Sequence, residues 1–131
     1  QTAAAGSVWR VCAFGQFTAA SSGTARTARV SCFWGSTQLG TITPTVLTST
    51  AQTTQFQVEC TLTGSSGTAL WTTGTMISRT ASATLLAMDN STAASTTVTA
   101  GAQTLDMRFS MSTAVAGDSW RIQSVTMERL K

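Results

Sequence analysis

Alternation between apolar and polar residues is the feature that most limits what this chain can fold into. It runs from Gln55 to Thr63 and returns from Leu105 to Met111. Because successive side chains of a β-strand point to opposite faces, a period of two predicts strands with one face in the core and the other in water. The inward residues of these two strands are expected to be Phe56, Val58, Cys60, Leu62, Leu105, Met107, Phe109 and Met111.

Two strands are predicted before these. Thr27–Trp34 alternates in the same way and follows a segment rich in turn residues at Ala19–Gly23. Val8–Phe17 would complete a hairpin with it. The apolar residues of Val8–Phe17 occupy both faces, which predicts a central strand covered on both sides. Further strands are expected at Gln38–Thr43, Ala69–Ser78, Thr84–Met88, Thr96–Thr99 and Ser119–Leu130, with a tight turn at Gly64–Gly67 and a loop at Met88–Ala94.

The last predicted strand changes phase in its middle. Trp120 and Ile122 share one face, but Val125 falls on the other. One extra residue in the strand would bring the apolar side chains back to a common face, so a β-bulge is predicted near Gln123 or Ser124.

The predicted fold is an all-β, two-sheet antiparallel β-sandwich of the jelly-roll type. Eight or nine short strands without helices between them favour a sandwich or a barrel. An immunoglobulin-like sandwich is the alternative, although the Cys and Trp spacing of antibody domains is absent. The length of 131 residues is typical of one domain, so a single domain over residues 1–131 is expected.

Hydroxyl groups supply most of the polar surface. The chain has 27 Thr and 16 Ser, while charged residues make up 10% of it, against about 25% in an average soluble protein. Thr is β-branched and favours strands over helices. Large apolar residues recur along the whole chain, which distinguishes it from a disordered Ser/Thr-rich linker.

Catalysis is not expected of this composition. The chain has no His, which removes the usual general base, the usual zinc ligand and every Ser-His or Cys-His nucleophile pair. A glycosidase needs two converging carboxylates. Here Glu59, Asp106 and Glu128 take outward strand positions, and Asp89 and Asp118 fall in predicted loops. No catalytic residue and no cofactor are therefore predicted.

Metal sites and disulfides are not expected either. Asp89–Ser91 offers oxygen ligands for calcium but is more typical of a turn capped by its own side chains. Cys12, Cys32 and Cys60 leave at least one thiol unpaired and have no CxxC spacing. Each is expected on the apolar side of its strand as a buried thiol, which is typical of a protein assembled in a reducing cytoplasm.

Charge and hydropathy argue against nucleic acid and membrane as partners. The net charge of +3 comes from eight cations and five carboxylates, and the closest cations within one strand, Arg26 and Arg29, fit a solvated strand face. No stretch approaches the roughly 20 apolar residues that span a bilayer, and the N-terminus has no signal-peptide pattern. A start at Gln1 is expected of a processed protein or of one piece of a longer protein.

Tryptophans are the candidate contact residues, because aromatic faces stack on sugars and anchor interfaces. Trp34, Trp71 and Trp120 are placed at or near strand ends, and at least two of the four tryptophans are expected to be buried in the core. Trp71 follows the Gly-rich turn out of phase with its apolar neighbours, so it is the best surface candidate of the three.

The order of these parts resembles a recurrent β-sandwich module of tailed-bacteriophage virion proteins. The resemblance rests on Ser22–Thr41, which reads SGTARTARVSCFWGSTQLGT, on the Phe56–Leu62 strand, on Gly64–Thr68 and on the closing Trp120–Leu130, WRIQSVTMERL. It covers nearly the whole chain by pattern and composition, with no catalytic motif.

The resemblance implies a structural role in a virion assembled in the host cytoplasm. Such modules occur in tail fibres, tailspikes and capsid decoration proteins, often as homotrimers beside other virion proteins. A receptor- or glycan-binding module at a fibre tip is the second hypothesis, with a host surface glycan as partner. A bacterial carbohydrate-binding module is the third, although such modules usually carry Tyr on the binding face and this chain has none.

Overall fold

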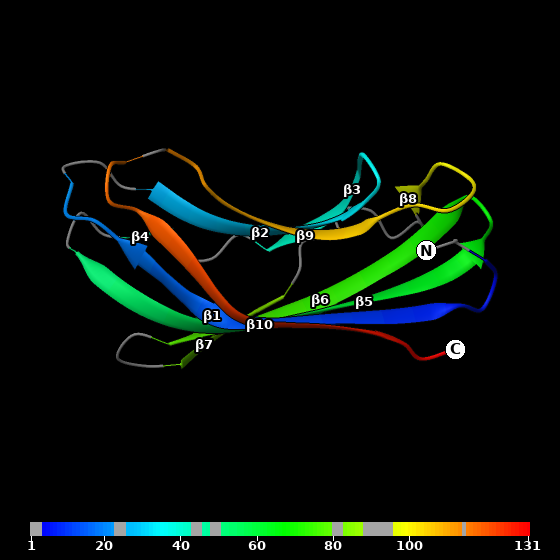
Figure 1. Ribbon diagram of the computed structural model, residues 1–131, viewed down its shortest axis with the longest axis horizontal. Helices are drawn as coiled ribbons and strands as arrows, with labels where there is room; N and C mark the ends of the chain where they lie inside the picture. The colour runs from blue at the N-terminus through cyan, green and yellow to red at the C-terminus, as the bar shows by residue number, and fades with distance from the viewer. Residues whose placement is uncertain are drawn as a thin grey trace.

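The described part of the chain is a two-layer β structure. The computed structural model describes residues 4–22, 26–42, 46–47, 51–79, 83–87, 96–113 and 115–131. Within these ranges there is no helix, and the strands form two antiparallel sheets stacked face to face (Figure 1). The predicted two-sheet antiparallel β-sandwich is confirmed.

The larger sheet has the strand order β10-β1-β5-β6-β7, and β8 also pairs with β6. β1 is central, as predicted, but it pairs with β5 and β10, so the predicted hairpin with the next strand is wrong. Phe14 on its outer face is 42% exposed, so β1 is not covered on both sides. The strands are β1 (Val8–Ala19), β5 (Gln52–Ser66), β6 (Ala69–Arg79), β7 (Ala83–Ala87), β8 (Thr96–Thr97) and β10 (Ser119–Arg129).

The smaller sheet is built around β2. β9 and β3 pair along the two edges of β2, and the short β4, which the alternation does not predict, pairs with its first two residues. The chain passes from the larger to the smaller sheet after β1 and again after β8, and it returns to the larger sheet after β4 and after β9. The strands are β2 (Arg26–Trp34), β3 (Thr37–Ile42), β4 (Val46–Leu47) and β9 (Leu105–Met111).

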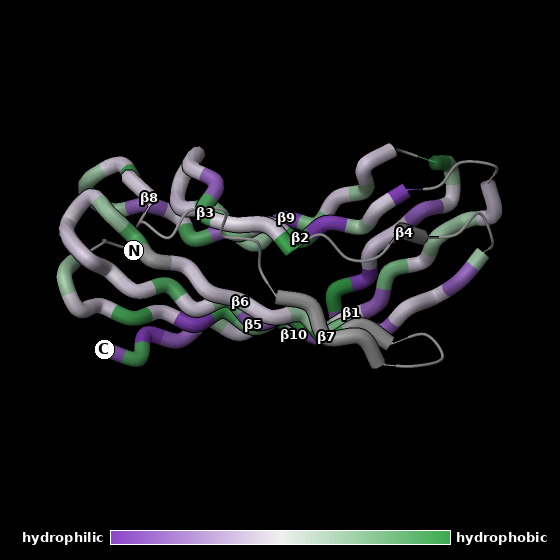
Figure 2. The backbone as a smooth tube through the Cα atoms, turned by 180° about the vertical axis from the view of Figure 1, so that it is seen from behind, coloured by the Kyte–Doolittle hydropathy of each residue, from purple (hydrophilic) through white to green (hydrophobic). Residues whose placement is uncertain are grey.

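The predicted bulge in β10 is confirmed. Ile122 lies opposite Gly15 and Ser124 lies opposite Phe14, which leaves Gln123 as the extra residue. A Cβ at position 15 would collide with the carbonyl oxygen of Arg121, so the bulge requires glycine there. Figure 2 shows hydrophobic and hydrophilic residues following one another along the strands of this sheet.

The turn after β5 begins later than predicted. β5 continues to Ser66, and the turn comes at Gly67 and Thr68. The backbone of Gly64 is instead held by the N-terminal segment: its N–H donates to the carbonyl of Ser7 at 2.8 Å, and its carbonyl accepts from Gly6 at 2.9 Å. These bonds keep the chain extended at the predicted turn.

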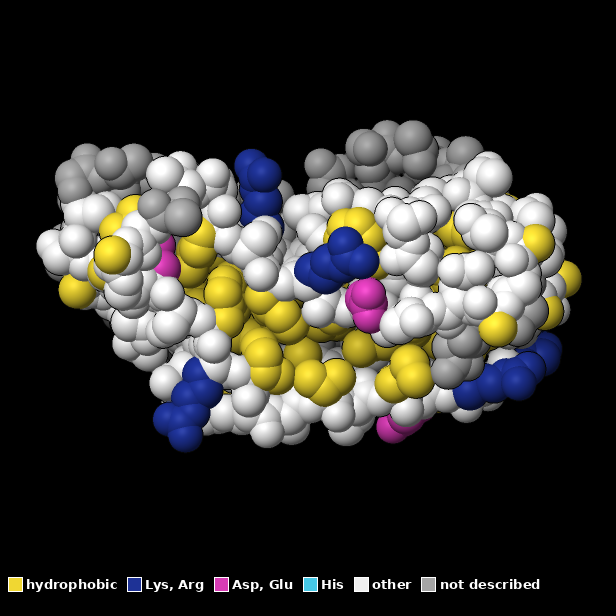
Figure 3. All heavy atoms as spheres, turned by 45° about the horizontal axis from the view of Figure 1, so that its top comes forward, with side chains coloured by type: hydrophobic (Ala, Val, Ile, Leu, Met, Phe, Trp, Pro, Cys, Tyr) yellow, Lys and Arg dark blue, Asp and Glu magenta, His cyan; other side chains and the backbone are white. Residues whose placement is uncertain are grey.

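β9 and β10 lie on the same flank of the sandwich. The ring of Phe109 in β9 lies 5.2 Å from that of Trp120 in β10, measured between centroids. Figure 3 shows a band of hydrophobic side chains along the centre of one face of the molecule, below the strands of the smaller sheet.

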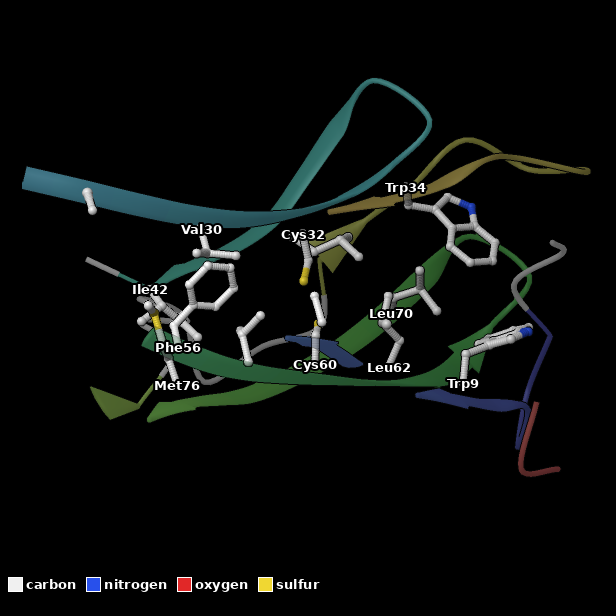
Figure 4. Close-up of a cluster of buried hydrophobic side chains, with 14 of the residues drawn as sticks. Trp9, Val30, Cys32, Trp34, Ile42, Phe56, Cys60, Leu62, Leu70 and Met76 are labelled. Carbon is white, nitrogen blue, oxygen red and sulfur yellow. The ribbon is translucent and has the colours of Figure 1, made fainter. Parts of the chain in front are cut away.

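The core fills the space between the sheets. Trp9 and Trp34 meet at one end with ring centroids 5.2 Å apart, and both are buried, which confirms that at least two tryptophans belong to the core. At the other end Phe17, Phe56 and Trp120 pack together with Phe109. Figure 4 shows core side chains from both sheets pointing toward one another, among them Val30, Cys32, Trp34, Phe56, Cys60, Leu62 and Leu70.

The three cysteines are free, but they do not share one environment. Cys32 and Cys60 are buried between the sheets, as predicted. Cys12 is half-buried on the outer face, where its Sγ lies 3.6 Å from Oε2 of Glu59, so its prediction as a core thiol is wrong. The reason is phase: the inward residues of β1 are the odd-numbered ones from Trp9 to Ala19.

Candidate functional site

The structure separates the three tryptophans offered as contact residues. Trp34 continues the inward phase of Cys32 and is fully buried against Trp9, so its indole reaches no ligand and this candidate is wrong. Trp71 belongs to β6, but its side chain lies outside the described residues. Trp120 is half-buried on the flank where β9 and β10 meet and stays a candidate.

We call this flank the open flank. Within the described residues β9 pairs only with β2, and β10 pairs only with β1. Ile122, Val125 and Met127 of β10 are 37%, 57% and 49% exposed, although their partners across the β1 ladder belong to the core-facing side of β1. The side chains of the open flank are Leu105, Met107, Phe109, Met111, Trp120, Ile122, Val125 and Met127.

The open flank exists because the smaller sheet ends at β9 and does not extend over β10. β9 is an edge strand of the smaller sheet, and its inward residues are partly buried and pack against the core. Trp120 reaches this packing through its ring contacts with Phe17 and Phe109, at 5.0 and 5.2 Å between centroids. The rest of β10 is exposed residue by residue from Arg121 to Arg129, so its apolar inner side faces water.

A second feature is a shallow depression of about 500 Å³ on the outer face of the smaller sheet. The register places outward side chains of β9, β2 and β3 next to one another across the sheet. Ser31 lies between Arg108 and Thr41, while Phe33 lies between Asp106 and Gln38. We call this feature the arginine depression, and its lining includes Arg29, Ser31, Phe33, Gln38, Arg108 and Ser110.

The polar groups of the arginine depression are ordered by contacts among themselves. The Cζ atom of Arg108 lies 3.8 Å from the ring centroid of Phe33. Gln38 Nε2 donates to Thr41 Oγ1 at 2.6 Å, and that hydroxyl is 2.9 Å from Ser31 Oγ. The sequence analysis missed this site because its members are ordinary outward residues on three strands. Their only signal is a large aromatic, Phe33, at an outward position.

A buried ion pair joins the starts of β2 and β10. Arg26, interpreted from sequence as part of a solvated face, is instead buried, with its guanidinium donating to both carboxylate oxygens of Asp118. It also donates to Ser22 Oγ at 2.8 Å and to the carbonyl of Ala20 at 2.6 Å. The hydrogen bond from Arg26 holds the pKa of the Asp118 carboxyl below its usual value, against the opposing effect of burial.

This network is structural in character. The Ala20 N–H donates to Asp118 Oδ1 at 2.8 Å, so both partners are saturated by neighbours. Its hydrogen bonds tie the end of β1, the start of β2 and the turn before β10 together. It therefore fixes where β10 enters the sheet.

Groups suited to metal binding do not converge in the described part of the chain. No set of three His, Cys, Asp or Glu side chains there could hold a metal ion. The hydrogen bond with Cys32, followed by burial, raises the pKa of the Cys60 thiol far above its usual range, which keeps the thiol neutral and unreactive. The Asp89–Asn90 segment lies outside the described residues. None of the described segments is a helix with the length and apolar character of a membrane span.

Comparison with protein-family models, with curated proteins and with solved structures found no match.

Proposed function

We propose that this chain is a non-enzymatic structural protein of a bacteriophage virion, and that it assembles with further copies of itself through the open flank. The observation that carries the proposal is the uncovered apolar side of β10. Contiguous exposed apolar surface of this kind marks interaction sites on soluble proteins. The resemblance in pattern and the charge-poor, hydroxyl-rich composition support the virion setting.

The occupant of the open flank is a second copy of the chain, and the charges of β10 support this choice. β10 carries Arg121 near its start and Glu128 near its end, both on the outer face. Two copies of β10 paired antiparallel about the middle of the strand place Arg121 of one opposite Glu128 of the other. The same register sets Ile122 opposite Met127 on the apolar side.

The pairing also satisfies backbone groups. An edge strand presents unpaired N–H and C=O groups that favour addition of another strand. A two-fold contact uses one surface patch twice, as in most homodimers. The homotrimer implied by the resemblance would need a different contact, three apolar flanks around one axis.

Light scattering on the purified protein and on charge variants tests this. We expect a dimer mass, loss of the dimer in Arg121→Glu and in Glu128→Arg, and recovery in the double variant, where the two charges have exchanged places. A monomer at every concentration would contradict the docking surface. A trimer would contradict the two-fold pairing and support the threefold arrangement.

A matched pair of variants tests the face itself. Val125→Glu places a charge on the open flank, whereas Ile77→Glu places one at an exposed apolar residue on the outer face of the larger sheet. Only the first should dissociate the dimer. If only the second does, the interface lies on the outer face and the proposal is wrong.

Mass spectrometry of purified bacteriophage particles tests the virion role. Peptides of this chain should occur there at stoichiometric level, and their absence would contradict the virion role.

A further inference from the structure

The arginine depression carries unmatched positive charge. Arg29 is exposed, and no described carboxylate forms an ion pair with it. Arg108 meets one carboxylate, that of Asp106, at 3.4 Å between exposed groups, which is a weak contact in water. Arg29 and Arg108 are diagonal neighbours on one face, since Arg29 lies opposite Ser110 and Arg108 opposite Ser31. Two guanidinium groups at this spacing favour an anion placed between them.

Phe33 gives one of these arginines a fixed orientation. With its Cζ 3.8 Å from the ring centroid, the guanidinium of Arg108 rests over the aromatic face. An arginine stacked in this way still directs its N–H edge away from the ring, where an oxyanion can replace the weak contact of Arg108 with Asp106. The stacking also lowers the entropy lost when a ligand binds, because the side chain is already ordered.

Uncharged donors and acceptors surround the two arginines. Ser31, Thr41 and Gln38 form a hydrogen-bonded row on β2 and β3, and Ser110 lies on β9 beside Arg29. Hydroxyl and amide groups at several points of a shallow, open surface match a ligand that bears several hydroxyls of its own. A volume of about 500 Å³ is in the range of small-ligand sites.

We propose that the arginine depression binds an acidic saccharide, a sugar that carries a carboxylate or a sulfate. The acid group lies between Arg29 and Arg108, and the sugar hydroxyls bond to Ser31, Gln38 and Ser110. A bare oxyanion would use the arginines and leave the row of hydroxyl and amide groups unused. The site lies on the outer face of the smaller sheet and shares β9 and Phe109 with the open flank. The residues proposed to bind the saccharide do not belong to the open flank, so the inference does not depend on self-association.

Calorimetric titration with defined oligosaccharides tests the proposal. The probes are a hexuronic acid oligosaccharide, a neutral glucose oligosaccharide of equal length and inorganic sulfate. We expect measurable binding of the first and none of the second. In NMR spectra the first should shift backbone amides of β2, β3 and β9. Arg29→Ala and Arg108→Ala should each weaken binding about tenfold or more, because each removes hydrogen bonds to a charged group.

Two variants distinguish specific binding in the arginine depression from nonspecific electrostatic attraction. Lys131→Ala removes one exposed positive charge beside the start of β1, on the other sheet, and should leave the affinity unchanged. Arg108→Lys keeps the charge but loses the planar fork, so it should recover only part of the affinity.

Four results would overturn the inference. They are no binding of the acidic oligosaccharide, equal binding of the neutral one, equal weakening by Lys131→Ala, and sulfate binding as tight as that of the acidic oligosaccharide. The last would leave an oxyanion site without sugar recognition.

Discussion

β5 and β10 belong to the same sheet and both carry apolar residues on their core-facing side, yet only one of them is buried. Val58 and Leu62 of β5 are fully buried, whereas Val125 is 57% exposed. The difference comes from what lies opposite: the smaller sheet covers β5 and ends before β10. Alternation therefore tells which face of a strand is apolar, and the width of the opposite sheet decides whether that face leaves water.

The largest effect on the free energy of unfolding is expected from a substitution that breaks the attachment of β10 to the rest of the sandwich. Asp118→Asn leaves the buried guanidinium of Arg26 without its counter-charge, and removal of one partner from a buried pair costs about 3–5 kcal/mol. Urea unfolding should show a loss of that size. A loss below about 1 kcal/mol would mean that water reaches the pair in solution.

The same pair has a defined pH dependence. The folded-state pKa of Asp118 lies below its ordinary value of 3.8, so the stability it contributes is complete above that value and is lost as the pH falls through the lower folded pKa. The gap in unfolding free energy between the parent protein and Asp118→Asn should be constant from neutral pH down to the ordinary pKa and should shrink below it. A gap that shrinks at higher pH would contradict the lowered pKa.

A matched substitution compares the two strands directly. Val58→Ala removes buried methyl groups and should cost roughly 2 kcal/mol in the free energy of unfolding, while Val125→Ala should cost less than about 0.5 kcal/mol. Both are measured by urea unfolding at a concentration where the protein is a monomer. Equal costs would show that the apolar side of β10 is covered within one chain.

Glu128→Gln should have the smallest energetic effect. The carboxylate of Glu128 accepts from Arg10 Nη2 at 2.7 Å, and both side chains are exposed. Surface ion pairs of this kind contribute little. At a concentration where the protein is a monomer, the midpoint of unfolding should not move measurably, in contrast to Asp118→Asn. A shift as large as that of Asp118→Asn would mean that the outer face of β10 is covered.

Thiol labelling of the parent protein compares the buried core with the outer face and needs no substitution. Cys12 on the outer face should react with a maleimide in the native protein, more slowly than a free cysteine, because partial burial and then the charge of Glu59 raise its pKa. Cys32 and Cys60 should react only after unfolding. Fast reaction of all three in the native state would contradict the buried core.

Local sequence pattern predicts strands well and their neighbours poorly. The inward phase of β5 and a bulge near Gln123 or Ser124 follow from alternation alone, because both depend on residues close in the chain. The burial of Arg26 does not, since its partner Asp118 is 92 residues away. The two-residue β4 is too short to show a period.

The candidate sites depend on register between strands. No sequence pattern within a single strand predicts that Arg108 lies next to Ser31 or that Phe33 lies between Asp106 and Gln38. Trp34 is an aromatic residue at a strand end, which suggests a contact residue, but its inward phase places it in the core. Phase is visible in the sequence, and here it outweighs the position of Trp34 at a strand end.

Hydrogen exchange of β5 and β10 amides as a function of protein concentration tests the central claim most directly. The central claim is that the apolar side and free edge of β10 stay uncovered until a second copy docks. Amides of β5 should be protected at every concentration. Amides on the free edge of β10 should exchange fast in dilute protein and become protected as the dimer forms. Protection of β10 that does not change with concentration would contradict the claim.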